Sequence, residues 1–271
     1  MFLTTSLRER MITRQKYTFQ KGFYILLGAV GSILLAFIFL TIFNMMFDQL
    51  LHPSGILRAA KDPSVMNSIG LTLYASMIAT AIAVLTGTPL AYILARRKFP
   101  GKWLIESLVD LPVIVPHTVA GIALLMIFGS HGLIGKFSPV RFVDALPGIV
   151  VAMLFVSAPF FVNSAREGFQ SVDPRLEWVA RSLGAGPWSA FLKVSLPLAF
   201  RHILAGAIMS WARGISEFGA VVVIAYYPLI APTLIWDRFL TSGLRESAPI
   251  SVLLISICMT IFVVLRMLSR R

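Results

Sequence analysis

The chain has 271 residues, of which 57% are hydrophobic and only 13% carry a charge, and its formal net charge is +12. Soluble domains carry about 25% charged residues, so this composition excludes an ordinary soluble protein and indicates a polytopic membrane protein. The basic excess is typical of the cytoplasmic ends of membrane spans. No nucleic-acid-binding motif accompanies it, so no nucleic-acid partner is expected. The single cysteine, Cys258, excludes an internal disulfide and a CxxC metal site.

Apolar runs of membrane-spanning length follow one another along the chain. Residues 1–21 form a basic amino-terminal segment, and the uncharged run 22–47 is too long for a signal-peptide core, so it is expected to remain as the first span. Five further spans are expected within a core over residues 65–268: 65–95, 108–128, 148–162, 203–225 and 249–265. Gly87 and Pro89 predict a kink in the second span. The predicted fold is all-α, with six transmembrane helices.

The distribution of Lys and Arg predicts how these spans are oriented. Six spans place both termini on one side, and the segments on that side carry seventeen Lys and Arg residues, whereas the segments on the other side carry six. Because cytoplasmic loops are enriched in Lys and Arg, both termini are predicted to be cytoplasmic. Residues 163–202 are then cytoplasmic as well.

The segment 173–197 is too polar to lie in lipid. Each of four charged side chains would cost about 2.5–3.5 kcal/mol at the bilayer centre: Arg175, Glu177, Arg181 and Lys193. Apolar residues at spacings of three and four predict two short amphipathic helices. Asp173-Pro174 is a helix-start signal, Gly184 lies in a turn, and Pro197 is expected to end the second helix. Such helices bury their apolar faces only against another surface.

This segment, called the coupling loop below, resembles the cytoplasmic EAA loop of ABC importer permeases, which docks on the ATPase subunit. Five residues fall at the positions of that family's consensus: Ala180, Gly184, Val194, Leu196 and Pro197. The consensus Glu aligns with Trp178, and the only Glu of the segment, Glu177, lies one position earlier. The resemblance implies that these residues meet or shape the contact with the ATPase: Ala180, Gly184, Ala185, Gly186, Trp188, Val194, Leu196 and Pro197.

Other segments are similar to the permease subunit of molybdate/tungstate importers, within the broader sulfate/molybdate group. They are 87–102, 110–125, 144–157 and 215–225. The resemblance covers about residues 65–268 and implies a type I ABC importer permease fold in the cell membrane of a prokaryote. It also implies that two copies form the oxyanion pathway, that two cytoplasmic ATPase subunits bind ATP and Mg²⁺, and that an external binding protein delivers the anion. No cofactor is expected on this chain itself.

Polar residues within the spans are the candidates for the translocation pathway or its gate. Arg213 and Glu217 are four residues apart in the fifth span, which predicts a neutralising pair on one helix face. Charges inside a membrane usually face a cavity or a partner, and a purely structural ion pair is the alternative. His117 is open between a packing role and a role toward cargo or protons. The candidates are Pro116, His117, Thr118, Ser210, Arg213, Ser216 and Glu217.

No GxxxxGK[ST] sequence is present, so the chain is predicted not to hydrolyse ATP. No catalytic residues and no metal site are expected. A permease of the same class for sulfate or another small oxyanion would share all these features and remains open. An ion-coupled secondary transporter is the more distant alternative. It would favour buried coupling carboxylates, for which only Glu217 qualifies, with Asp110 near a span end, and inverted repeats, which are not evident.

Overall fold

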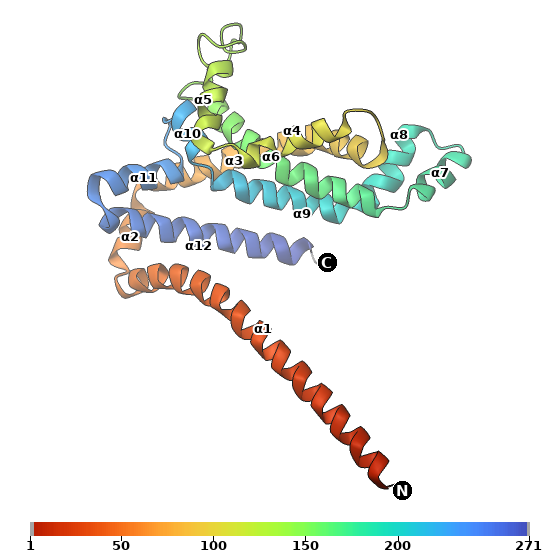
Figure 1. Cartoon of the computed structure of the whole chain (residues 1–271). Helices are drawn as coiled ribbons and strands as arrows, with labels where there is room; N and C mark the ends of the chain where they lie inside the picture. Colours follow the sequence, from red (N-terminus) through yellow and green to blue (C-terminus); the bar gives the residue numbers. More distant parts are fainter. Residues whose placement is uncertain (1–2, 270–271) are drawn as a thin grey trace. The chain divides into compact units, whose positions relative to one another are not determined.

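The computed structural model describes the backbone of residues 3–269 and the side chains of residues 22–264 and 267. Within these ranges the chain is helical and contains no strand (Figure 1). The helices are α1 (Leu3–Leu51), α2 (Ser54–Lys61), α3 (Pro63–Arg96), α4 (Lys102–Ile114), α5 (His117–Phe128), α6 (Leu146–Ser171), α7 (Pro174–Ser182), α8 (Pro187–Ala190), the π-helical turn η1 (Phe191–Ser195), α9 (Leu196–Ile215), α10 (Gly219–Ile224), α11 (Ala231–Ser242) and α12 (Leu244–Ser269).

The chain divides into two compact units between Pro53 and Ser54. The first unit is α1, whose segment Gly22–Leu51 has a mean hydropathy of 2.7. This segment contains the whole of the expected first span, 22–47. The exposed apolar side chains along it suit a lipid environment.

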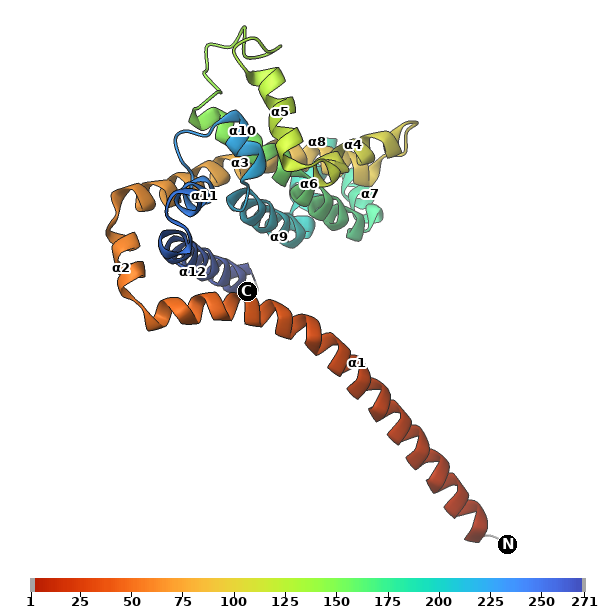
Figure 2. The same cartoon turned by 60° about the vertical axis from the view of Figure 1, so that its left-hand side comes forward.

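The second unit is built around α3, α6 and α9, which lie side by side in both views (Figures 1 and 2). Small residues bring these helices close together. A Cβ atom on Gly87 of α3 would lie 2.8 Å from the ring of Phe161 on α6, and one on Gly206 of α9 would lie 2.8 Å from Cβ of Ser164. The helix α3 continues through Pro89, so the predicted kink does not interrupt it, and Gly87 serves the packing.

The number of spans agrees with the prediction. In the described part of the chain, five helices are long and apolar enough to cross a membrane, and α4 with α5 makes a sixth if the bent pair is one span. The fourth and sixth expected spans lie within α6 and α12.

The third expected span, 108–128, is not one straight helix. It begins earlier, at Lys102, and bends by 114° between α4 and α5. Val115, which precedes Pro116, is extended, with φ −69° and ψ 130°. A residue before proline is driven out of the helical region by the proline ring, so Pro116 accounts for the break.

The fifth expected span, 203–225, is also broken. The helix α9 ends at Ile215 and α10 begins at Gly219, so Glu217 lies in the break and not on the same helix as Arg213. The Glu217 side chain accepts a hydrogen bond from the Ala220 backbone N–H at 2.8 Å. A side-chain oxygen thus replaces a missing carbonyl at the start of α10.

Candidate functional site

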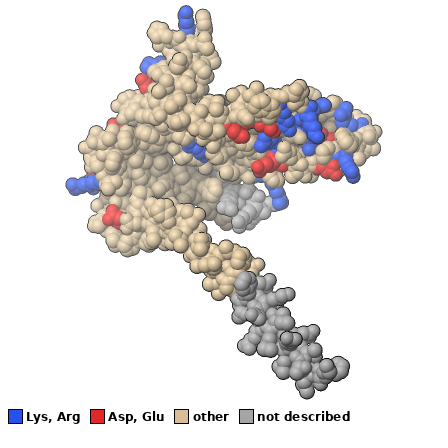
Figure 3. Space-filling model, in the orientation of Figure 1, with Lys and Arg blue, Asp and Glu red and all other residues tan. Residues whose placement is uncertain are grey.

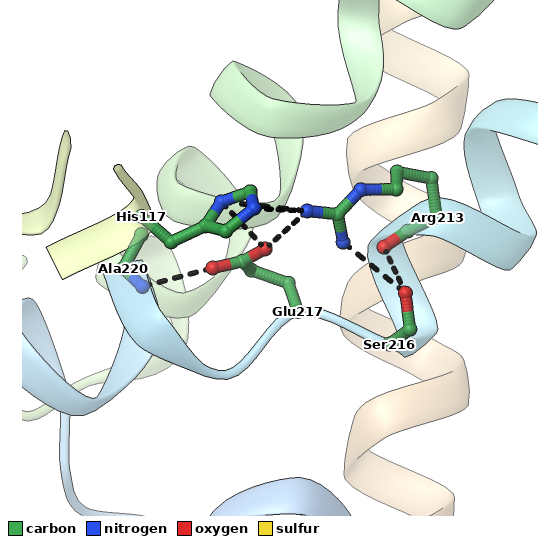
Figure 4. Close-up of polar contacts among 5 residues, drawn as sticks. All are labelled: His117, Arg213, Ser216, Glu217 and Ala220. Atoms are coloured by element: carbon green, nitrogen blue, oxygen red, sulfur yellow. Dashed lines mark hydrogen bonds and ion pairs between the residues drawn. The ribbon is translucent and has the colours of Figure 1, made fainter. Parts of the chain in front are cut away.

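A polar cluster forms where the two broken spans meet, and Glu217 is its centre (Figure 4). Glu217 is 1% exposed. Its Oε2 atom lies 3.0 Å from Nη2 of Arg213 and 3.4 Å from Nδ1 of His117. Arg213 also donates from Nη1 to the Ser216 hydroxyl at 3.1 Å. The predicted pair of Arg213 and Glu217 is therefore present, although Glu217 lies beyond the end of α9.

Arg213 also reaches the imidazole ring of His117. Its Nη2 atom lies 2.8 Å from Nε2 and 3.4 Å from Nδ1 of His117. A guanidinium group only donates, so a ring nitrogen of His117 accepts in this contact. Glu217 in turn accepts from the Ala220 N–H through Oε1 and pairs with Arg213 through Oε2.

Close packing of α5 on α10 keeps the cluster together (Figure 2). A Cβ atom on Gly219 would lie 2.7 Å from Cβ of His117, and one on Gly121 would lie 2.8 Å from the Ala220 carbonyl oxygen. Side chains at either glycine would push the two segments apart.

The remaining pathway candidates lie outside these contacts. Pro116 and Thr118 flank His117 and are exposed. Ser210 is fully buried, and its hydroxyl is without a hydrogen-bond partner in the described residues. The structure thus brings together four of the seven candidates: His117, Arg213, Ser216 and Glu217. In the sequence they belong to two separate apolar runs.

The coupling loop contains the two predicted helices, α7 and α8, joined at Gly184. Asp173 caps α7 by accepting from the Arg175 backbone N–H at 2.9 Å. Gly184 has φ +92°, the left-handed conformation that favours glycine at a helix end. The next N–H, that of Ala185, donates to the Ala180 carbonyl oxygen at 3.0 Å and closes the turn.

Large apolar side chains of the coupling loop point into solvent. Trp178 is 64% exposed, Leu183 84% and Trp188 76%. A hollow of about 720 Å³ lies between these helices and the end of α3. Of the sequence-predicted coupling residues, Gly184, Gly186, Trp188 and Pro197 are exposed, whereas Ala180, Ala185, Val194 and Leu196 are partly buried.

The expectation that Pro197 ends the second helix is wrong. The chain stays helical from α8 through η1 into α9. In the π-helical turn the Leu196 N–H donates to the Phe191 carbonyl oxygen, five residues back. Proline lacks an N–H and crowds the carbonyl four residues before it. The wider π turn comes directly before Pro197, which occupies the first turn of α9, where proline is tolerated.

Comparison with known proteins gives the family. Residues 87–271 match the model of the family described as "Binding-protein-dependent transport system inner membrane component". The chain belongs to this family of transport-system membrane components. It is 46% identical over 246 residues to the molybdate/tungstate transport system permease protein WtpB of Thermococcus kodakarensis, covering 91% of this chain and 96% of that protein. It is 33% identical to a probable sulfate transport system permease protein of Marchantia polymorpha, over 79% of this chain and 76% of that protein.

Solved structures show that the fold is that of ABC importer permeases. A chain of a bacterial ABC transporter for import of the acidic polysaccharide alginate superposes with a TM-score of 0.74 at 15% identity, over 95% of this chain and 99% of that one. A chain of the MetNI methionine ABC transporter in an inward-facing conformation superposes with a TM-score of 0.63 at 14% identity, over 76% of this chain and 94% of that one.

The carboxylate of Glu177, one position before the consensus Glu, makes contacts within the chain that the sequence did not predict. Glu177 accepts hydrogen bonds from Nε of Arg96 at 2.7 Å, the Tyr92 hydroxyl at 2.9 Å and the Ser195 hydroxyl at 2.6 Å. Tyr92 and Arg96 are four residues apart near the end of α3, and that spacing is the one signal in the sequence that they share a face. Their distance in sequence from Glu177 hid the contact.

Proposed function

We propose that this chain is the membrane-spanning subunit of a molybdate/tungstate importer. The observation that carries the proposal is the 46% identity to WtpB over nearly the full length of both chains. Two copies form the pathway, two cytoplasmic ATPase subunits supply the energy, and an external binding protein delivers the oxyanion. ATP and Mg²⁺ belong to the ATPase subunits, and this chain contributes no catalytic residue.

The coupling loop is the contact with the ATPase in this proposal. Its exposed Trp178, Leu183 and Trp188 offer the apolar surface that a partner's groove would bury. Lys and Arg side chains gather over the same end of the second unit (Figure 3), which supports a cytoplasmic location for the coupling loop. ATP-driven movement of two such loops would tip the spans between inward-facing and outward-facing states.

The polar cluster lies at the pathway or its gate. It joins α5 to the break between α9 and α10, so opening at this point requires the contact between His117 and Arg213 to change. Arg213 balances the negative charge of Glu217 at Oε2, and Oε1 accepts from the Ala220 N–H, so Glu217 presents no unpaired negative charge that would repel a dianion. Weak contact with cargo suits a pathway, because tight binding there would oppose release.

Uptake into proteoliposomes tests this function. The chain is reconstituted with its ATPase and binding protein, and uptake of molybdate, tungstate and sulfate is compared with and without internal ATP. We expect ATP-dependent uptake of molybdate or tungstate that excess sulfate barely inhibits. Preferred uptake of sulfate would change the substrate and keep the mechanism. Equal uptake without ATP or partners would refute the importer and favour the secondary transporter.

A further inference from the structure

We propose that Glu177 is a positioning residue that ties the coupling loop to α3 and to the start of α9, so that the loop and both helices move as one body. This inference rests on the proposed function, because it concerns how movement of the ATPase reaches the pathway. The family's consensus carboxylate position is occupied by Trp178, and Glu177 has turned instead toward its own chain.

Apolar burial does not hold α7 in place. None of its residues is buried, and its largest apolar side chains are the exposed ones, including Trp178 and Val179. A short helix of nine residues is not stable by itself in water. The position of the helix therefore depends on contacts with neighbouring elements, and the side-chain hydrogen bonds of Glu177 reach α3 and η1.

These contacts are protected from water. The side chains of Arg96 and Glu177 are 9% and 13% exposed, and Ser195 is fully buried. Nη2 of Arg96 is itself buried without a hydrogen-bond partner in the described residues. Arg96 thus depends on Glu177 to balance its charge, because a buried charge left unpaired is strongly unfavourable. The pair is held on both sides, by Tyr92 from α3 and by Ser195 from η1.

The attached helices lead away from the coupling loop toward the polar cluster. The helix α9 has 20 residues, about 30 Å at 1.5 Å per residue. It begins one residue after Ser195 and carries Arg213 in its last turn. The helix α3 packs along α6 and α9. A displacement of α7 that is carried through Glu177 therefore reaches the contact between Arg213 and His117 as movement of a rigid helix, whereas a free α7 would only bend its own loop.

The ratio of molybdate taken up to ATP hydrolysed tests this role in the reconstituted complex. Glu177→Gln keeps the shape of the side chain and removes its charge. We expect the ratio to fall about tenfold, the factor that loss of one charge-assisted hydrogen bond gives in a two-state population, while the ATPase remains bound. Glu167→Gln is the matched control, since Glu167 is exposed near the end of α6 and should keep the wild-type ratio.

Substitution of Arg96, which contacts Glu177 within the chain, distinguishes an internal role of Glu177 from a contact with the ATPase. Arg96→Gln should lower the ratio as Glu177→Gln does. The ratio of the double variant should be no lower than that of the more impaired single variant, because both substitutions remove the same contact. A wild-type ratio in Glu177→Gln would overturn the proposal. So would a fall in Glu177→Gln that Arg96→Gln does not share, since it would place Glu177 against the ATPase.

Two milder variants decide the matter if Glu177→Gln does not assemble. Tyr92→Phe and Ser195→Ala each remove one donor and keep the charge pair, and each should lower the ratio about twofold to threefold. Wild-type ratios in both would overturn the proposal. Absence of ATP-dependent uptake by the unmodified complex would instead refute the proposed function, so the two failures are distinguishable.

Discussion

Glu177 keeps its charge in surroundings that have opposing effects on it. Burial raises the pKa of Glu177, but hydrogen bonds from Ser195, Tyr92 and Arg96 outweigh burial and hold its pKa below the ordinary value of 4.5. A carboxyl group whose pKa is lowered by folding contributes stability above its unfolded pKa, and that contribution is lost as the pH falls through the folded pKa. The attachment of α7 is thus complete at neutral pH and weakens only in acid.

An infrared titration checks this prediction. Protonated carboxyl groups give a separate infrared band. The part of this band that is present in the unmodified protein and absent from Glu177→Gln is assigned to Glu177. We expect the midpoint of this band's titration to lie below pH 4.5, and to shift to higher pH in Ser195→Ala, because that variant lacks one donor to the charged form. A band that titrates at pH 4.5 or above in the unmodified protein would contradict the network.

Single residues also show where sequence reasoning reached its limit. The pair of Arg213 and Glu217 was predictable from their spacing of four residues, although the helix that this spacing assumes ends at Ile215. The contact of His117 with Arg213 was not, because 96 positions separate them and no local pattern encodes a long-range contact. Glu177 was noticed for being one position early, but its partners on α3 could be identified only from the folded chain.

At the scale of the elements, helix starts and the turn at Gly184 were predictable, whereas the breaks within the membrane spans were not. Asp62 and Asp173 each precede a proline, and both cap a helix by accepting a backbone N–H. The breaks at Val115 and at Glu217 lie inside continuous apolar runs, where hydrophobicity gives no sign of a bend. Pro116 was visible in the sequence, but a proline within a span can kink the helix or end it, and packing decides between these outcomes.

The packing of α5 on α10 predicts different effects for two glycines. Gly121→Ala places a Cβ atom 2.7 Å from Cβ of Val223 and 2.8 Å from the Ala220 carbonyl oxygen, so α5 must move away from α10. We expect a loss of about 1–3 kcal/mol in the free energy of unfolding. Gly70→Ala on α3 is the control, because nothing lies within 4 Å of the added atom and alanine favours a helix by about 0.5–1 kcal/mol.

Thermal unfolding of the two variants in the same detergent measures the difference. The Gly121→Ala protein should unfold at a lower temperature than the unmodified chain, and the Gly70→Ala protein at the same or a higher temperature. Equal midpoints for both variants would mean that the close approach of α5 and α10 does not contribute to stability.

At the scale of the whole molecule, two exposed leucines in different segments of the second unit should respond differently to a charge. Leu183 is 84% exposed in the coupling loop, and Leu133 is 81% exposed in the segment that follows α5. Neither supports the fold by burial, so an aspartate at either position should leave the melting temperature of the isolated chain unchanged. Their partners differ in the proposed complex, because only the coupling loop meets the ATPase.

Co-purification of the ATPase with a tagged chain distinguishes the two positions. Leu183→Asp would bury an unpaired carboxylate in the docking groove, a cost of several kcal/mol, and we expect the retained ATPase to fall at least tenfold. Leu133→Asp should retain the ATPase at the level of the unmodified chain. If both variants retain it equally, the apolar surface of the coupling loop is not the docking surface, and the energy of ATP hydrolysis must enter this chain elsewhere. If both lose it, the charge acts through the fold, and the melting temperatures of the two isolated variants will have fallen together.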